Sequence, residues 1–207
     1  LEDNTADLDR MRRALRQSGY ASVRLPPGEL GAYANRFRQG NFTATAVLSH
    51  AEDGWELTEL FPGTSEQPLL GVAADLGTTQ IAFYLVDLQT GSLLDRLSVP
   101  NPQIPYGEDI LTRIVFASKP DTLILMRNLL RATFNETLSF LVEKHGHRLT
   151  HIYALTVAGN TTMTHFFLGL DPSRLCKEPY IPVANTFPVL HGADLRLGMH
   201  PRGLVVV

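Results

Sequence analysis

The chain has 207 residues, of which 44% are hydrophobic and 19% charged, and no apolar run reaches the roughly 18 residues that a membrane-spanning helix requires. A formal net charge of −3 argues against a general nucleic-acid-binding protein, because such proteins usually carry a strong basic excess. The one cysteine, Cys176, cannot form an internal disulfide, a four-cysteine zinc site or an iron–sulfur cluster, so a reducing, cytoplasmic setting is the default expectation.

Residues 1–66 are expected to form a small α/β domain. The acidic, polar start has neither the pattern of a signal peptide nor an initiator methionine, which suggests that the chain begins inside a longer polypeptide. Asn4 or Thr5 is the expected N-cap of a first helix. The apolar face of that helix carries Leu8, Met11 and Leu15.

A second helix and a hairpin complete the expected first domain. The helix follows Pro26-Pro27 and places Tyr33 and Phe37 on one face. Two strand-like runs, 42–49 and 55–61, are separated by the turn residues 52–54. Residues 62–68 are polar and rich in helix and strand breakers, so we place a linker there and a second domain over 67–207.

The second domain is predicted to be an α/β fold with a mixed sheet. Three strands joined by tight turns predict an antiparallel meander, and two helices then lead to a parallel strand and a further helix. The expected elements are strands 69–75, 80–88 and 93–99, helices 106–117 and 121–145, strand 151–157, helix 161–168 and a strand beginning at 204–207. This order resembles the ribonuclease-H-like lobe of the actin and hexokinase superfamily. Both faces of strand 80–88 are apolar, so we expect a central strand that is buried on two sides.

The turn after the first of these strands is the strongest local signal for ligand binding. Asp75 ends an apolar strand, and Gly77, Thr78 and Thr79 make the turn into the next one. We expect a positive φ at Gly77 and a concavity of N–H groups and hydroxyls that suits phosphate oxygens. The Asp75 carboxylate could hold Mg²⁺ through water. The alternative is an ordinary hairpin turn.

A shaped loop precedes the first helix of this domain. Asn101 and Gln103 stand beside prolines, and Gly107 leads into the expected helix. Asp109 is either a base or magnesium ligand, or it pairs with Arg113 four residues later as an ordinary ion pair on the helix surface.

The third motif opens the helix expected at 161–168. Gly159, Asn160 and Thr161 follow the parallel strand, at the position where α/β sheets favour ligands. Free N–H groups at a helix start attract anions. The alternative is that Asn160 or Thr161 only caps the helix, with Met163 and His165 as packing residues.

Three stretches in this order and spacing resemble one family. They are GVAADLGTTQIAFYLVDLQTGSLL, NPQIPYGEDILTRIVFA and VAGNTTMTHFFLGLDPSRL, followed by KEPYIPV at 177–183. Together they look like the actin-like ATPase region of the reductive activators of corrinoid proteins. Residues 1–66 are more loosely similar to the small domain that precedes this region.

The resemblance implies a function and a set of site residues. Such activators use ATP, with Mg²⁺, to help an electron from a [2Fe–2S] domain return a Co(II) corrinoid protein to Co(I). Asp75, Gly77, Thr78 and Thr79 match the first phosphate loop. The remaining matches are Gly159 and Asn160 in the third stretch, and Asn101, Gln103, Gly107, Asp109 and Arg113 in the second.

Two departures from the family pattern shape the expectation for this chain. The cysteines of the [2Fe–2S] domain and the second phosphate loop are both missing, so we expect an internal fragment that hydrolyses no ATP by itself. The rival hypotheses are a small-molecule kinase, a docking module that ignores nucleotide, and an activator of another low-potential metalloenzyme. The expected partner is a corrinoid protein, with no nucleic acid and no membrane, and a homodimer is left open.

Overall fold

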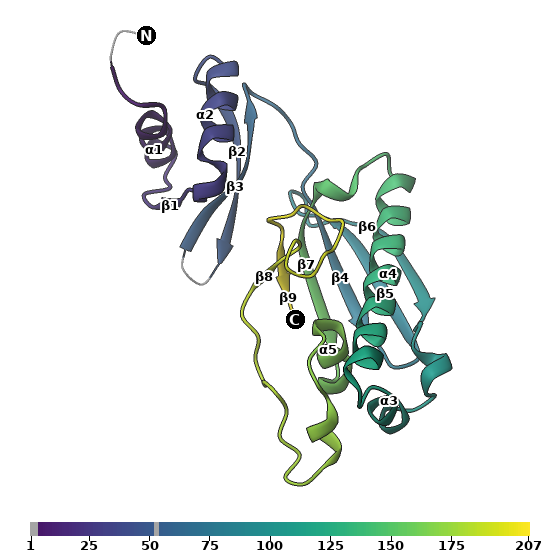
Figure 1. Ribbon diagram of the computed structural model, residues 1–207. Helices are drawn as coiled ribbons and strands as arrows, with labels where there is room; N and C mark the ends of the chain where they lie inside the picture. Colours follow the sequence, from purple (N-terminus) through teal and green to yellow (C-terminus); the bar gives the residue numbers. More distant parts are fainter. Residues whose placement is uncertain (1–3, 52–53) are drawn as a thin grey trace. The chain divides into compact units, whose positions relative to one another are not determined.

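The structure is a computed structural model that describes residues 4–51 and 54–207 (Figure 1). The chain forms two compact units, Leu1–Gln67 and Pro68–Val207. Of the turn predicted at 52–54, Glu52 and Asp53 lie outside the described residues.

The first unit packs two helices on a three-stranded sheet. Its sheet has the order β1-β3-β2, with β1 parallel and β2 antiparallel to β3. The core contains the predicted apolar positions Met11, Leu15, Tyr33 and Phe37. The elements are α1 (Asp7–Gln17), β1 (Val23–Arg24), a 3₁₀ turn (Pro27–Glu29), α2 (Leu30–Gln39), β2 (Ala44–Ala51) and β3 (Gly54–Pro62).

The predicted N-cap of the first helix is wrong. Helix α1 begins at Asp7 with Ala6 in the N-cap position, and no side chain in the described part of the chain caps it. The hydroxyl of Thr5 instead accepts a hydrogen bond from Nη2 of Arg13 at 3.3 Å. The Thr5 hydroxyl is therefore engaged by Arg13 of the same helix and does not cap the helix start.

The second unit contains a six-stranded mixed sheet in the order β6-β5-β4-β7-β9-β8. The β4–β7 and β7–β9 pairs are parallel and the remaining pairs antiparallel, which confirms the predicted α/β fold with a ribonuclease-H-like order. Strand β8 lies inside the long excursion after α5, where no strand was predicted. The elements are β4 (Leu70–Leu76), β5 (Gln80–Asp87), β6 (Leu93–Pro100), α3 (Ile110–Phe116), α4 (Pro120–Lys144), β7 (Ile152–Gly159), α5 (Thr161–Leu168), β8 (Leu190–His191), β9 (Leu204–Val206) and 3₁₀ turns at Ile104–Tyr106, Leu149–His151 and Ser173–Cys176.

The helix predicted from residue 106 begins later. A 3₁₀ turn ends at Tyr106, and Gly107 then adopts a φ of +157°, which is not helical. Asp109 caps a new helix that starts at Ile110. The non-helical backbone at Gly107 places the Gly107 carbonyl where Arg113 can donate to it, as described below.

One face of the large sheet is covered by helices. Inward-facing side chains alternate along the strands, as in Ile81, Phe83 and Leu85 of β5, and each is fully buried. The ring of Phe134 in α4 meets the ring of Phe83 edge to face, with centroids 4.9 Å apart, and lies tilted against the ring of Phe167 in α5 at 4.8 Å. Among the described residues, no helix combines the length and apolarity needed to cross a bilayer.

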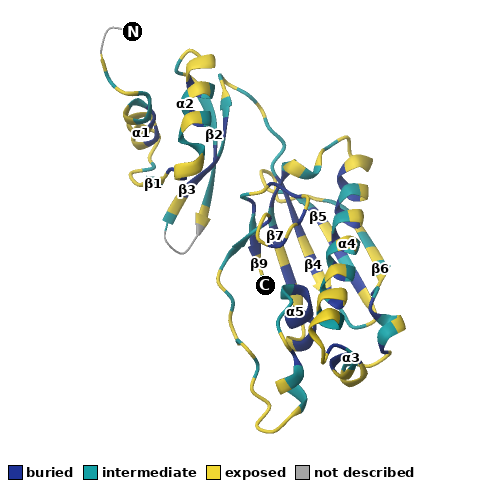
Figure 2. Ribbon diagram, viewed as in Figure 1, coloured by how far each residue is buried: buried dark blue, intermediate teal, exposed yellow. Residues whose placement is uncertain are grey.

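The prediction of a strand buried on both faces is wrong for β5. Tyr84 is 39% exposed, and Ala73 and Asp75 of the neighbouring β4 are also exposed (Figure 2). The apolar character of Ala82 and Tyr84 therefore does not reflect burial by the described helices, which pack on the other face. The consequence is that Asp75 stands on an open face of the sheet.

Candidate functional site

The Gly77–Thr79 turn connects β4 to β5 and lies at the carboxyl end of β4. Asp75 stands just before it, opposite Ala82 on β5 and Ala158 on β7. These small neighbours leave the carboxylate exposed, and it has no hydrogen-bond partner among the described residues. An open carboxylate at a strand end suits a hydrated Mg²⁺, which prefers one or two carboxylates and substrate phosphates.

Gly77 is required for a different reason from the one predicted. Its φ is not positive. A Cβ at this position would lie 2.4 Å from the carbonyl oxygen of Gln80, far inside van der Waals contact. The turn closes so tightly on the first residue of β5 that only glycine fits.

The first and third motifs come together in the structure. Strand β7 runs parallel to β4, and Gly159 lies opposite Leu76. The Asn160 side chain caps α5 by accepting a bond from the N–H of Met163 at 3.0 Å, and its Nδ2 lies 3.3 Å from Oγ1 of Thr78 as a donor. Asn160 therefore caps the helix, as one alternative held, and also joins it to the Gly77–Thr79 turn.

The start of α5 offers donors beside this junction. The N–H groups of Thr161 and Thr162 have no acceptor among the described residues, and N–H groups at a helix start favour anions. A cavity of about 380 Å³ lies at this end of β7. It is lined by Val157, Ala158, Gly159, Thr161, Thr164, Ala184, Asn185, Phe187 and Val207.

Asn101 supports the Gly77–Thr79 turn through hydrogen bonds, and Gln103 in turn holds Asn101. Nδ2 of Asn101 donates to the carbonyl of Gly77 at 2.8 Å, and its backbone N–H donates to the carbonyl of Thr79 at 2.9 Å. The backbone N–H of Gln103 donates to Oδ1 of Asn101, and its side chain donates to the carbonyl of Met126 at 3.0 Å. Both amide side chains are buried, so they position the turn rather than face a ligand.

Asp109 is exposed and serves as the N-cap of α3. Its two carboxylate oxygens accept from the N–H of Thr112 at 2.9 Å and from the Thr112 hydroxyl at 2.7 Å. These bonds lower the pKa of the Asp109 carboxyl below its ordinary value. A carboxylate occupied in this way is a weak base, and the predicted catalytic role of Asp109 stays a prediction.

Arg113 does not form the predicted surface ion pair with Asp109. Its guanidinium turns inward and is fully buried. Nε donates to the carbonyl of Gly107 at 2.7 Å, and Nη1 lies 3.7 Å from the sulfur of Met163 in the first turn of α5. Burial lowers the pKa of Arg113, an effect that the charge of Asp109 partly offsets. Arg113 therefore ties α3 to the helix that borders the candidate site.

His165 makes specific contacts that the sequence did not predict beyond packing. It is fully buried in α5, with Nδ1 lying 2.6 Å from the carbonyl of Thr161. Its Nε2 accepts from the backbone N–H of Val183 at 3.1 Å, so the proton resides on Nδ1. The one available sequence signal was a histidine directly before the apolar run 166–168.

The donor set fits some of the implied cofactors and not others. Hydroxyls, an amide, free N–H groups and one open carboxylate suit the phosphates of a nucleotide with Mg²⁺. Among the described residues, no group of three or more His, Cys, Asp or Glu side chains could hold a metal by itself. A [2Fe–2S] cluster needs four protein ligands, and one cysteine cannot supply them.

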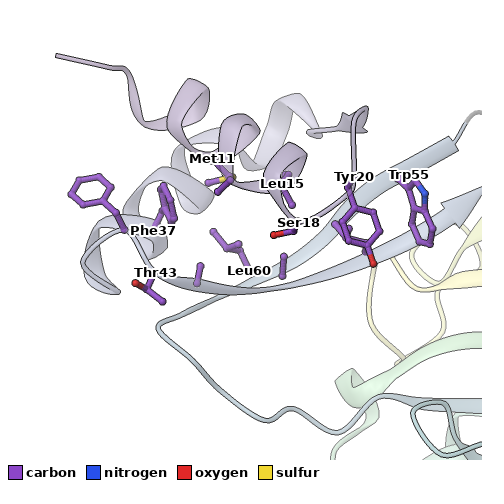
Figure 3. Close-up of a pocket in the computed structure, with 13 residues that line it drawn as sticks. Met11, Leu15, Ser18, Tyr20, Phe37, Thr43, Trp55 and Leu60 are labelled. Atoms are coloured by element: carbon purple, nitrogen blue, oxygen red, sulfur yellow. The ribbon is translucent and has the colours of Figure 1, made fainter. Parts of the chain in front are cut away.

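A second cavity, of about 630 Å³, lies in the first unit between its helices and β2 (Figure 3). None of the described residues that line it carries a charge, so it does not suit phosphate. The small side chains of Ala44 and Ala46 on β2 help to leave the space open. The lining consists of Met11, Ala14, Leu15, Ser18, Tyr20, Phe37, Phe42, Thr43, Ala44, Ala46, Leu48, Trp55 and Leu60.

Comparison with known proteins finds matches to both units of the chain. The family model described as the RACo linker region matches residues 1–67, and the RACo middle region matches 70–207. The corrinoid activation enzyme RamQ of Eubacterium limosum is 34% identical over 141 residues, which cover 68% of this chain and 24% of that protein. A solved structure of a reductive activator for corrinoid, iron–sulfur protein superposes with a TM-score of 0.91 at 31% identity, over 100% of this chain and 33% of that one. The chain thus spans between a quarter and a third of the length of these relatives.

Proposed function

The chain belongs to the RACo family, and from this premise we propose that its second unit forms one wall of the ATP site in a reductive activator of a corrinoid protein. The observation that carries the proposal is the junction of the Gly77–Thr79 turn with Asn160. Two motifs about 80 residues apart in sequence meet there, at the carboxyl ends of adjacent parallel strands, where α/β sheets place their ligands.

Each group at the junction has a role in holding a triphosphate. The N–H groups of Thr161 and Thr162 and the hydroxyls of Thr78 and Thr79 donate to phosphate oxygens. Asp75 would hold a hydrated Mg²⁺ through its waters, and the ion would supply positive charge beside the phosphates. Catalysis of phosphoryl transfer is mostly positioning and charge stabilisation, so no covalent step is assigned to this chain.

Nucleotide state is proposed to act on the corrinoid partner through conformation. The α5 helix begins at the phosphate site and carries His165, which holds Val183 in the following segment. A change in the first turn of α5 between the ATP and ADP states would therefore reach that segment directly. Electron transfer itself is not assigned to residues of this chain, because one cysteine cannot hold a [2Fe–2S] cluster.

Asp75→Asn tests the proposal in the intact gene product. With Mg²⁺ present, we expect ATP affinity, measured by isothermal titration calorimetry, to fall about 10- to 100-fold, the effect of losing a charged hydrogen-bonding group. With EDTA in place of Mg²⁺, we expect equal or tighter binding, because the carboxylate then only repels phosphate. Stability should not change, since no described residue bonds to this side chain.

Glu136→Gln, which removes an exposed carboxylate from α4, is the matched control and should bind Mg·ATP like the wild type. Equal Mg·ATP affinity of the Asp75→Asn variant and the wild type would refute the assigned site.

A further inference from the structure

The segment Lys177–Val183, here called the apolar loop, exposes three large apolar side chains. Tyr180 is 63% exposed, Ile181 61% and Val183 58%. Single exposed apolar residues are common, but several neighbours in one short segment mark an interaction surface. None of these side chains contributes to the candidate phosphate site.

The apolar loop is held in the conformation that exposes these side chains. The N–H of Tyr180 donates to the carbonyl of Lys177 at 2.7 Å, and the N–H of Val183 donates to the buried His165 at 3.1 Å. Tyr180 has a φ of +62°, a conformation that bulky residues rarely adopt and that is found preferentially at functional positions. A pinned, strained segment that faces outward is preorganised for binding.

A basic groove of about 330 Å³ runs beside these side chains. Its described lining contains two cations and no carboxylate, and neither cation forms an ion pair with any described residue. Glu178 belongs to the loop but does not line the groove, and the nearby Asp171 is occupied by the N–H and hydroxyl of Ser173. The lining residues are Arg174, Lys177, Pro179, Ile181, Pro182 and Val183.

Helix α3 extends the same surface. It contacts the 3₁₀ turn Ser173–Cys176 that leads into the apolar loop, and both lie at the same end of the unit (Figure 1). Leu111 and Val115 of α3 are 62% and 69% exposed. The surface thus combines exposed apolar side chains from two elements with a groove whose lining holds two cations, and this groove complements an acidic protein surface with an apolar residue at its centre.

We propose that the apolar loop and its basic groove are the docking surface for the corrinoid protein, which would bind through an acidic surface bearing an exposed apolar side chain. The proposal rests on the proposed function for the identity of the partner. Contact through His165 between the loop and the first turn of α5 makes this surface responsive to the phosphate site.

The test measures the affinity of the intact gene product for a purified corrinoid protein in its Co(II) state by biolayer interferometry. The double variant Tyr180→Asn, Ile181→Ser removes the apolar contacts, and asparagine tolerates a positive φ. We expect it to bind about 30-fold more weakly or worse, as for loss of an interface hot spot. Lys177→Glu should weaken binding about tenfold and reduce its salt dependence. Phe140→Ser, on the exposed side of α4, is the control and should bind like the wild type.

The outcomes separate the two proposals. If the wild type binds the corrinoid protein and both loop variants bind equally well, the docking surface is wrong while the proposed function stands. If the wild type binds no corrinoid protein, the proposed partner is wrong and the docking proposal falls with it. Self-association that the double variant abolishes, measured by analytical ultracentrifugation, would show that a second copy occupies the surface and would also overturn the proposal.

Discussion

Replacing Gly77 with valine is expected to reduce ATP affinity at least about 100-fold in the intact gene product. Any Cβ at this position would meet the carbonyl oxygen of Gln80 at 2.4 Å, so the turn must open. Opening displaces the hydroxyls of Thr78 and Thr79 and breaks the contact from Thr78 to Asn160, and misplacing ligand groups by about 1 Å costs about 100-fold. The measurement is equilibrium binding of Mg·ATP, with the free energy of unfolding measured in parallel.

The control for this variant is Gly31→Val, at an exposed position of α2 where an added Cβ meets no atom within 4 Å. It should leave ATP affinity unchanged. Gly77→Val should also cost roughly 1–3 kcal/mol of stability, as overpacking does. A folded Gly77→Val protein with wild-type ATP affinity would contradict the role of the turn.

Replacing Arg113 with alanine is expected to lower the free energy of unfolding by about 3–5 kcal/mol. The substitution leaves a cavity between α3 and α5, and it leaves the carbonyl of Gly107 without its donor. Urea denaturation followed by circular dichroism measures the change.

Arg113→Met separates packing from charge. Methionine fills most of the space without a buried cation, so this variant should recover at least half of the loss. It should also bind ATP nearly as well as the wild type, because Arg113 is fully buried and does not line the cavity at the start of α5. If Arg113→Ala unfolds like the wild type, the guanidinium does not tie the two helices together.

Local patterns predicted the elements of the second unit well. The apolar and aromatic run at 80–88, bounded by turn residues, predicted β5. The helix 161–168 was predicted at its observed bounds, because Asn160 is both a breaker and a good cap. The order of elements was enough for the mixed sheet, since parallel strands need a crossover and tight turns enforce antiparallel pairs.

Predictions failed where a local rule competed with tertiary contacts. The spacing of Asp109 and Arg113 predicts an ion pair, yet Arg113 finds Gly107 and Met163 in the interior while Asp109 caps its own helix. Gly77 looked like a residue chosen for positive φ, and it is instead chosen for close approach. Neither contact is visible in the spacing of neighbouring residues.

The sequence predicted the motifs of the candidate site, but not the hydrogen bonds that hold these motifs in place. Each motif carried donor groups suited to phosphate, and parallel pairing of their strands brings them together. The support comes from Asn101, which reaches the carbonyl of Gly77 from the end of β6, and from His165, which reaches Val183. Such long-range hydrogen bonds depend on the folded arrangement and leave no periodic signal in the sequence.

A crystal structure of the intact gene product with Mg²⁺ and a non-hydrolysable ATP analogue tests the central claim most directly. The terminal phosphates should lie against the Gly77–Thr79 turn and the N–H groups of Thr161 and Thr162, with a magnesium-bound water on Asp75. A triphosphate bound elsewhere, with this turn facing solvent, would contradict the account.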